Sequence, residues 1–175
     1  LLKPAKPIVV GGFTRENNKD LGLRLALELL EVPYRYVTGY AGVAELRVAI
    51  QRGEINYTSE SLTGYMTGGT LLVKEGVVVP LYQEGLLGPE GDTVRDPRSD
   101  LPSFRELFRK VKGSDPSGPL GEAFKISGGS RTMLRFITVA PKTPSKLVEI
   151  LRSSFRQTFE DPEFKAEAER ALRFQ

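Results

Sequence analysis

Short apolar runs alternate with helical stretches along most of this chain, and this alternation limits the folds that it can adopt. The clearest unit is "VTGYAGVAELRVAIQRGEIN" at residues 37–56. An apolar strand ends there at Gly39, a helix is expected from about Gly42 to Arg52, and Gly53 ends the helix before another strand. Repeated strand–helix–strand order favours a parallel sheet with helices on both faces. We therefore predict an α/β fold with a mostly parallel sheet of about five strands.

The five predicted strands are short, apolar and bounded by glycine, proline or polar residues. Pro80 lies inside the fourth of them, which places that strand at an edge or a bulge of the sheet. A long loop is expected between Gly85 and Pro102, where glycine, proline and aspartate are frequent. The predicted strands are residues 8–10, 34–37, 54–58, 77–83 and 134–140.

Helical patterns separate these strands, and several of them have start signals in the sequence. Asn18 is expected to cap the first helix, and Ser103 with Glu106 forms a capping box for another. Thr143, followed by a proline, is expected to cap the next-to-last helix, and Asp161 the last. Further helices are expected over residues 42–52 and 120–131, and a helix weakened by its glycines is expected within residues 59–76.

The missing residue types narrow the possible chemistry. The 175 residues include no histidine and no cysteine, which excludes Ser–His catalytic triads, disulfides and thiolate metal sites. The net charge of +3 is spread over 25 basic and 22 acidic residues without a run of five like charges, so no nucleic-acid partner is expected. We also expect no cofactor, no metal and no transmembrane segment.

Three turns follow the first three predicted strands, at the edge of the sheet where α/β proteins bind ligands. "GGFTREN" at residues 11–17 lacks the residues of a nucleotide-binding loop, but its glycines let a ligand approach the backbone. "TGYAG" at residues 38–42 leaves the amides of Gly42 and Val43 unobstructed at the start of a helix. Such a helix start can bind an anion without a catalytic side chain. "SES" at residues 59–61 adds two hydroxyls and a carboxylate.

Each of these turns also has a purely structural interpretation. Residues 11–17 are then a plain connection from strand to helix, and residues 38–42 are a tight turn with a packed tyrosine. Residues 59–61 are then a cap for the next helix. The sequence leaves both interpretations open for all three turns.

Three segments of the chain resemble a known family. They are "VPYRYVTGYAGVAELRVAIQRGEIN", "DLPSFREL" and "APKTPSKLVEILRSSFRQTFEDPEFKAEAERAL". In this order and spacing they resemble the extracytoplasmic solute receptors of tripartite tricarboxylate transporters. The resemblance implies a periplasmic-binding-protein-like fold of type 2. Residues 1–132 would be the second ligand-binding lobe, and residues 133–175 a strand and two helices that return to a first lobe.

The resemblance further implies a periplasmic receptor, not an enzyme, that captures a small carboxylate and delivers it to the membrane permease subunits of a transporter. We expect its signal peptide to lie outside this chain. In this family, backbone amides and waters hold the carboxylate. Together with the turns described above, this gives the expected ligand-binding residues, which are Gly12, Phe13, Thr14, Asn17, Tyr40, Ala41, Gly42, Ser59 and Glu60.

Two other functions stay open at this point. An effector-binding domain of a transcriptional regulator shares the two-lobed α/β plan, although it requires an attached helix-turn-helix. A small-molecule transferase would use Asp20 or Glu60. The last two helices also have wide apolar stripes, and where no first lobe covers them they should either fold back onto the second lobe or self-associate with a neighbouring molecule.

Overall fold

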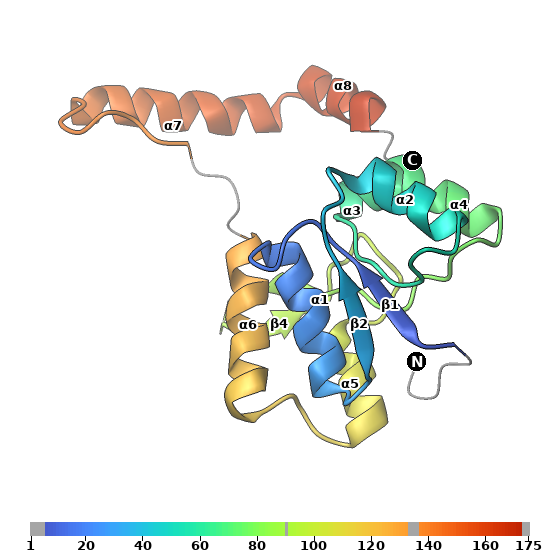
Figure 1. Ribbon diagram of the computed structural model, residues 1–175. Helices are drawn as coiled ribbons and strands as arrows, with labels where there is room; N and C mark the ends of the chain where they lie inside the picture. The colour runs from blue at the N-terminus through green and yellow to red at the C-terminus, as the bar shows by residue number, and fades with distance from the viewer. Residues whose placement is uncertain (1–5, 90, 133–136, 173–175) are drawn as a thin grey trace.

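Helices, rather than a sheet, make up most of this structure, a computed structural model that describes residues 6–89, 91–132 and 137–172 (Figure 1). The strands are β1 (Ile8–Gly11), β2 (Tyr34–Val37), β3 (Leu86–Leu87) and β4 (Thr93–Val94). The helices are α1 (Asn18–Leu29), α2 (Val43–Gln51), α3 (Leu62–Gly64), the π-helical turn η1 (Tyr65–Gly69), α4 (Thr70–Lys74), α5 (Phe104–Lys112), α6 (Gly118–Thr132), α7 (Ser145–Glu160) and α8 (Pro162–Leu172).

The predicted periplasmic-binding-protein-like lobe with a five-stranded parallel sheet is wrong. The described residues form a parallel pair, β1–β2, and an antiparallel pair, β3–β4, while 52% of these residues are helical. The first two predicted strands are confirmed as β1 and β2. The third is reduced to a single parallel bridge between Val10 and Tyr57. The predicted loop between Gly85 and Pro102 contains the short β3–β4 hairpin.

The last two predicted strands fail because apolar composition alone does not supply a neighbouring strand to pair with. Residues 77–83 run without regular structure, and the one bridge described there joins Gln83 to Ser103. Val79 is 77% exposed, so this apolar run is not covered by a second layer. Of the fifth predicted strand, residues 137–140 are not in a strand, and residues 134–136 lie outside the described residues.

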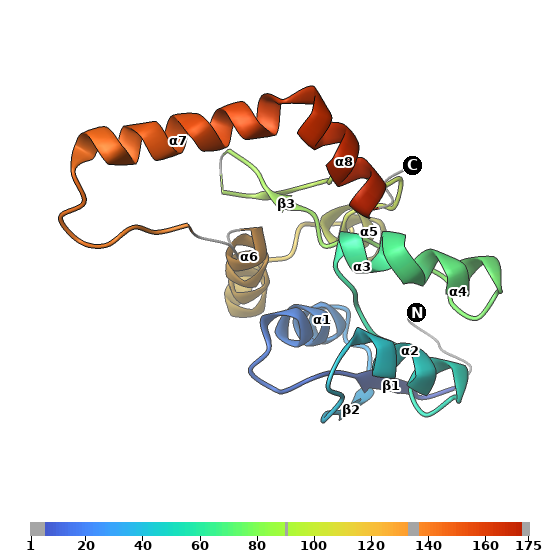
Figure 2. The same ribbon diagram turned by 90° about the horizontal axis from the view of Figure 1, so that it is seen from above.

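The main hydrophobic core lies between the β1–β2 pair and the helices α1, α5 and α6. Its centre includes Val10, Leu27 and Phe104, whose side chains are completely buried, and Phe124 packs against them from α6. Helices α1 and α6 lie side by side in both views (Figures 1 and 2). A smaller cluster of Leu46, Ala49 and Ile55 fixes α2 over the ends of the strands. These two clusters position the turns that follow β1 and β2.

Two of the predicted helix caps are confirmed. The Ser103 hydroxyl accepts a hydrogen bond from the Glu106 amide (3.2 Å), and the Glu106 carboxylate accepts one from the Ser103 amide (2.6 Å). The Asp161 carboxylate accepts a hydrogen bond from the Phe164 amide (2.8 Å) at the start of α8. The predicted end of α2 is also confirmed, since Gly53 has a φ of +72°.

Two other predicted caps are wrong by one residue. Asn17, and not Asn18, caps α1, because the side chain of Asn18 instead bonds the Ser130 hydroxyl of α6 (2.6 Å). Helix α7 has Pro144 at its N-cap position, and the Thr143 hydroxyl donates to the Ala140 carbonyl, one turn back (2.7 Å). In both cases a tertiary or turn contact competes with the local capping preference.

We expect Ser103→Ala to lower the free energy of unfolding by roughly 1 kcal/mol, because the variant loses the side-chain half of a capping box. Urea denaturation followed by circular dichroism measures this effect. Ser114→Ala is a matched control, since Ser114 is exposed and lies just beyond α5. Equal stabilities of the two variants would show that the box does not stabilise α5.

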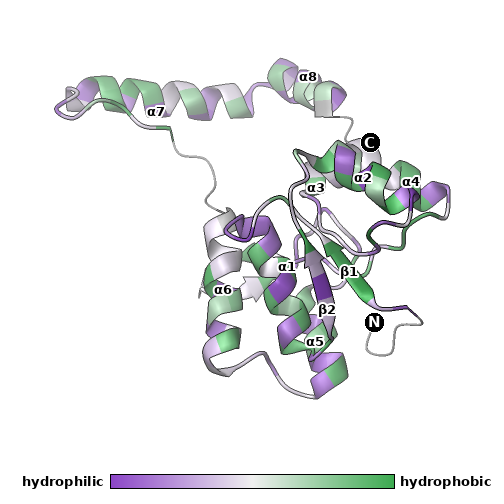
Figure 3. Ribbon diagram, in the orientation of Figure 1, coloured by the Kyte–Doolittle hydropathy of each residue, from purple (hydrophilic) through white to green (hydrophobic). Residues whose placement is uncertain are grey.

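Helices α7 and α8 form an arm beside the rest of the structure, which we call the body; α7 is separated from the body, and α8 ends on the side where α2 and α3 lie (Figures 1 and 2). The Phe159 and Phe164 rings meet edge to face at the elbow between the two helices, with centroids 5.6 Å apart. Helix α7 carries both polar and apolar residues in the hydropathy view (Figure 3). Nearly all of its side chains, including the apolar ones, are exposed. The apolar face of the arm therefore has no covering layer in this structure.

Candidate functional site

The three turns that we expected to bind ligand lie together at one edge of the body. The Gly39 amide donates to the Phe13 carbonyl (3.1 Å), which joins the second turn to the first. The Thr58 hydroxyl donates to the Gly11 carbonyl (3.1 Å), and the Gly11 amide donates to the Tyr57 carbonyl (2.9 Å). We call residues 11–17, 38–42 and 58–61 the turn cluster.

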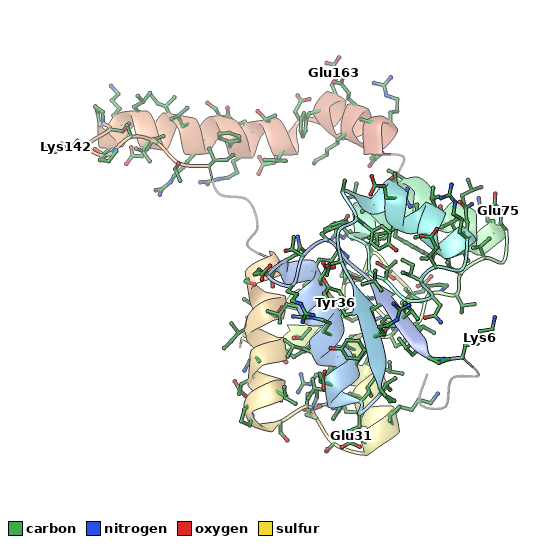
Figure 4. All side chains as sticks on the ribbon, viewed as in Figure 1. Lys6, Glu31, Tyr36, Glu75, Lys142 and Glu163 are labelled. Carbon is green, nitrogen blue, oxygen red and sulfur yellow. The ribbon has the colours of Figure 1, made fainter. Side chains whose placement is uncertain are left out.

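A completely buried carboxylate, Asp20 of α1, organises the first turn. Its Oδ2 accepts hydrogen bonds from the Phe13 amide (2.6 Å) and the Tyr36 hydroxyl (3.0 Å), and its Oδ1 lies 2.6 Å from the Lys19 ammonium. Tyr36 lies on β2 beside α1 (Figure 4), and its hydroxyl also bonds the Thr14 carbonyl (2.8 Å). Burial and the bond to Asp20 raise the pKa of the Tyr36 hydroxyl.

In the first turn, therefore, the Asp20 carboxylate of α1 occupies the position where we expected the carboxylate of a ligand. The Phe13 amide is occupied by Asp20, and the Gly12 amide donates to the Val37 carbonyl (2.9 Å). A Cβ at Gly12 would lie 2.6 Å from Asp20 Oδ2, so the close approach of Asp20 already requires glycine there. Asn17 caps α1 by accepting from the Lys19 amide (3.0 Å). Thr14 is exposed at the rim of the turn.

The second turn leaves backbone donors free at the start of α2. Gly42 is the N-cap residue and has no side chain to cap the helix. Within the part of the chain that the structure describes, the amides of Val43 and Ala44 have no acceptor, and the first helical bond runs from the Leu46 amide to the Gly42 carbonyl (3.3 Å). Open space surrounds the position of a Cβ at Gly42. An anion can therefore approach these amides.

The neighbours of this helix start limit what it can bind. The Glu45 carboxylate accepts from the Ala41 amide (2.8 Å), so this predicted donor is occupied and a negative charge lies beside the site. Tyr40 is half-buried against the cluster of Leu46 and Ala49, and it forms a wall next to Gly42.

The third turn is held by an arginine. Arg47 of α2 donates through Nε and Nη2 to the two carboxylate oxygens of Glu60 (2.9 and 2.6 Å), and Nη2 also donates to the Gly64 carbonyl (2.7 Å). The bond to Glu60 raises the pKa of the Arg47 guanidinium. The buried Ser59 hydroxyl has no hydrogen-bond partner among the described residues. Glu60 thus bonds an internal cation rather than facing the site as a free carboxylate.

The sequence interpretation missed Glu45, Tyr36 and Arg47 at this edge, and it missed the structural role of Asp20. Glu45 had a usable signal, because an acidic side chain three residues after an N-cap commonly reaches back to a preceding amide. Asp20, Tyr36 and Arg47 had none, since their bonds depend on which elements pack together. Asp20 and Glu60 were the acids of the transferase alternative, and both are engaged by internal donors. The turn cluster therefore contains a helix start whose first amides have no acceptor among the described residues, and its two acids are paired internally.

The other features of the described residues do not form a second candidate site at this edge of the body. A shallow pocket of about 640 Å³ lies at the opposite end of α1, between Glu28 and Lys112. The Lys112 ammonium there is paired with Glu31 (2.8 Å). The described residues contain no cluster of acidic side chains suited to a metal ion, and no described helix has the length and apolarity of a membrane span.

Comparisons with protein-family models, with curated proteins and with solved structures gave no match for this chain.

Proposed function

We propose that this chain is a non-catalytic binding module for a small carboxylate, which binds at the start of α2 within the turn cluster. The main support is that the amides in the first turn of α2 have no hydrogen-bond acceptor among the described residues. The helices α1, α3, α5 and α8 begin with capping side chains, whereas Gly42 of α2, like Pro144 of α7, supplies none. The positive end of the helix dipole and the amides of Val43 and Ala44 favour a negative ligand there.

The wider role that we propose is that of a periplasmic receptor, which delivers the carboxylate to the permease subunits of a tripartite tricarboxylate-type transporter. The resemblance of residues 32–56 and 140–172 to such receptors supports this role. The engagement of Asp20 and Glu60 by internal partners favours binding over a transferase reaction. The described residues do not form the five-stranded sheet that the resemblance implies, so the proposed role rests on the sequence segments and not on the fold.

We expect Gly42→Val to abolish most of the binding without unfolding the protein. Gly42 has φ −168° and ψ 176°, an extended conformation that valine adopts readily, and no atom lies within 4 Å of the added Cβ. The branched side chain would cover the amides that bind the anion. Losing a charge-assisted hydrogen bond costs about 1.5–3 kcal/mol, which corresponds to a roughly ten- to hundredfold weaker affinity.

Calorimetric titration of this chain with succinate, glutamate and benzoate measures the effect, and circular dichroism checks the fold. Tyr40→Phe keeps the ring that forms the wall and should weaken binding less. Ser114→Val is the distant control and should bind as the parent does, because Ser114 lies beyond α5. A folded Gly42→Val variant with the parent's affinity would place the anion elsewhere.

Glu45→Gln should increase the affinity for the same carboxylates about two- to fivefold. The amide oxygen of glutamine can still accept from the Ala41 amide, while the negative charge beside the helix start is removed. Glu54→Gln is the matched control, because Glu54 is exposed beyond the other end of α2 and pairs weakly with Arg52 (3.9 Å). An unchanged or lower affinity in Glu45→Gln would contradict an anion at this helix start.

A further inference from the structure

The exposed apolar face of α7 is a feature of the structure that the anion site does not explain. Leu147, Leu151, Phe155 and Phe159 follow one another at intervals of four residues, so they form a single ridge along the helix. Their side chains are between 37% and 62% exposed. Ile150 on α7 and Phe164 on α8 extend this surface, and together the six residues form what we call the arm face.

The area of the arm face is suited to a protein interface. A large side chain has roughly 150–250 Å² of surface, so these exposed fractions leave on the order of 500 Å² of apolar area uncovered. A standard interface buries about 800 Å² on each partner, of which a little over half is apolar, or about 450 Å². The arm face alone therefore supplies the apolar area that one side of a stable dimer requires.

The arm is also accessible to another molecule. No hydrogen bond or ion pair described for residues 137–172 joins α7 or α8 to the body. Figures 1 and 2 show α7 separated from α1, α2 and α6 in both views. A second chain can thus reach the whole ridge without disturbing the core.

The order of side chains along the ridge favours a second copy of the same chain. The two leucines lie in the first half of α7 and the two phenylalanines in the second half. In an antiparallel pair of α7 helices, Leu147 lies opposite Phe159 of the second copy and Leu151 lies opposite Phe155. Each ring then packs against an aliphatic side chain, whereas a parallel pair would place ring against ring and leucine against leucine.

Two further features suit this antiparallel arrangement. Ser154 and Thr158 lie on the same side of α7 as the ridge, and their small side chains let the two backbones approach closely. Ridges with a spacing of four residues interdigitate at about −50° in the commonest class of helix packing. Antiparallel helices also oppose their dipoles favourably.

We propose that the chain forms a two-fold symmetric dimer in which α7 of one copy packs antiparallel on α7 of the other. The surface is self-complementary, as a closed symmetric interface requires. This inference is independent of the anion site, because the turn cluster and the arm face share no residue.

Sedimentation velocity of this chain over a wide range of concentrations tests the proposal. The parent should be a dimer, and Leu151→Glu and Phe155→Glu should each be monomeric, because a charge would be buried at the centre of the interface. Ile126→Glu makes the same kind of change at a side chain of α6 that is 71% exposed, and it should remain dimeric. Circular dichroism should show an unchanged body in all three variants.

Disulfide formation tests the orientation, since the chain has no cysteine of its own. In the antiparallel pair Ser154 lies close to the two-fold axis, so Ser154→Cys should form an intermolecular disulfide on oxidation. Thr158→Cys should not, because the two thiols would be about 15 Å apart along the helix axes. Linkage of both variants would indicate a parallel pair and overturn the proposal.

Two other results would also overturn it. The first is a parent that stays monomeric at every concentration, including a monomer whose arm binds anionic lipid vesicles instead. The second is a dimer that persists in both Leu151→Glu and Phe155→Glu, because its interface would then lie outside the arm face.

Discussion

Phe104→Ala should destabilise the body by about 3–5 kcal/mol, which is a large fraction of the stability of a small domain. The Phe104 side chain is completely buried at the start of α5. Its ring contacts three others, with centroid distances of 5.3 Å to Tyr82, 5.9 Å to Phe108 and 4.5 Å to Phe124. Truncation would leave a cavity where α5, α6 and residues 77–83 meet.

Urea denaturation of the parent and of Phe104→Ala gives the difference in the free energy of unfolding. Phe159→Ala is the matched control, because its ring is 62% exposed on the arm. In the monomer, a surface substitution of this kind changes stability by about 0.5 kcal/mol or less. Measurements on the Phe155→Glu background remove the contribution of dimerisation. A cost below 1 kcal/mol for Phe104→Ala would show that the four rings do not form the core.

Features of the fold that depend on neighbouring residues could be predicted from the sequence. The capping box of Ser103 and Glu106 is confirmed because both partners lie within one helical turn. Gly53 ends α2 as predicted. The position just after a helix often has a left-handed backbone conformation, which glycine adopts most easily whatever structure follows. The strands β1 and β2 were identified because each is a short apolar run with turn residues on both sides.

Features that depend on pairing over long distances could not be predicted in the same way. "VVVPLYQ" has the composition of a strand, but Pro80 lacks an amide donor, and none of the strands in the described part of the chain pairs with this segment. "EINYT" makes one bridge to β1 and then turns away at Thr58, whose hydroxyl bonds the Gly11 carbonyl. Strand propensity reflects how well a side chain fits a sheet, and it does not indicate whether a partner strand is available.

The candidate site shows the same division between local and distant information. The sequence indicated that the amides of Gly42 and Val43 would be unobstructed at a helix start; in the structure Gly42 is the N-cap residue of α2, and the amides without an acceptor are those of Val43 and Ala44. It did not indicate that Asp20 would occupy the Phe13 amide or that Arg47 would bind Glu60. Seven and thirteen residues separate these pairs, and no helical or strand periodicity connects them. Only the packing of α1 and α2 against the strands brings them together.

The second large effect is expected at Asp20, where Asp20→Ala should cost about 3–5 kcal/mol of stability. The substitution removes the acceptor of the Phe13 amide and one of the two acceptors of the Tyr36 hydroxyl, and it leaves the Lys19 ammonium buried without its counter-charge. Glu31→Ala is the control, because Glu31 is 81% exposed and its pair with Lys112 should contribute less than about 1 kcal/mol.

A double-mutant cycle with Lys19→Met separates the two parts of this cost. Part of the loss in Asp20→Ala comes from the unpaired ammonium, so Lys19→Met together with Asp20→Ala should be more stable than Asp20→Ala alone. The loss that remains in the double variant reports the two hydrogen bonds that hold the first turn against β2. Urea denaturation of all four proteins, with circular dichroism as the probe, provides both quantities. If Asp20→Ala is no less stable than Glu31→Ala, the buried carboxylate does not hold this turn, and the Phe13 amide is then available to a ligand after all.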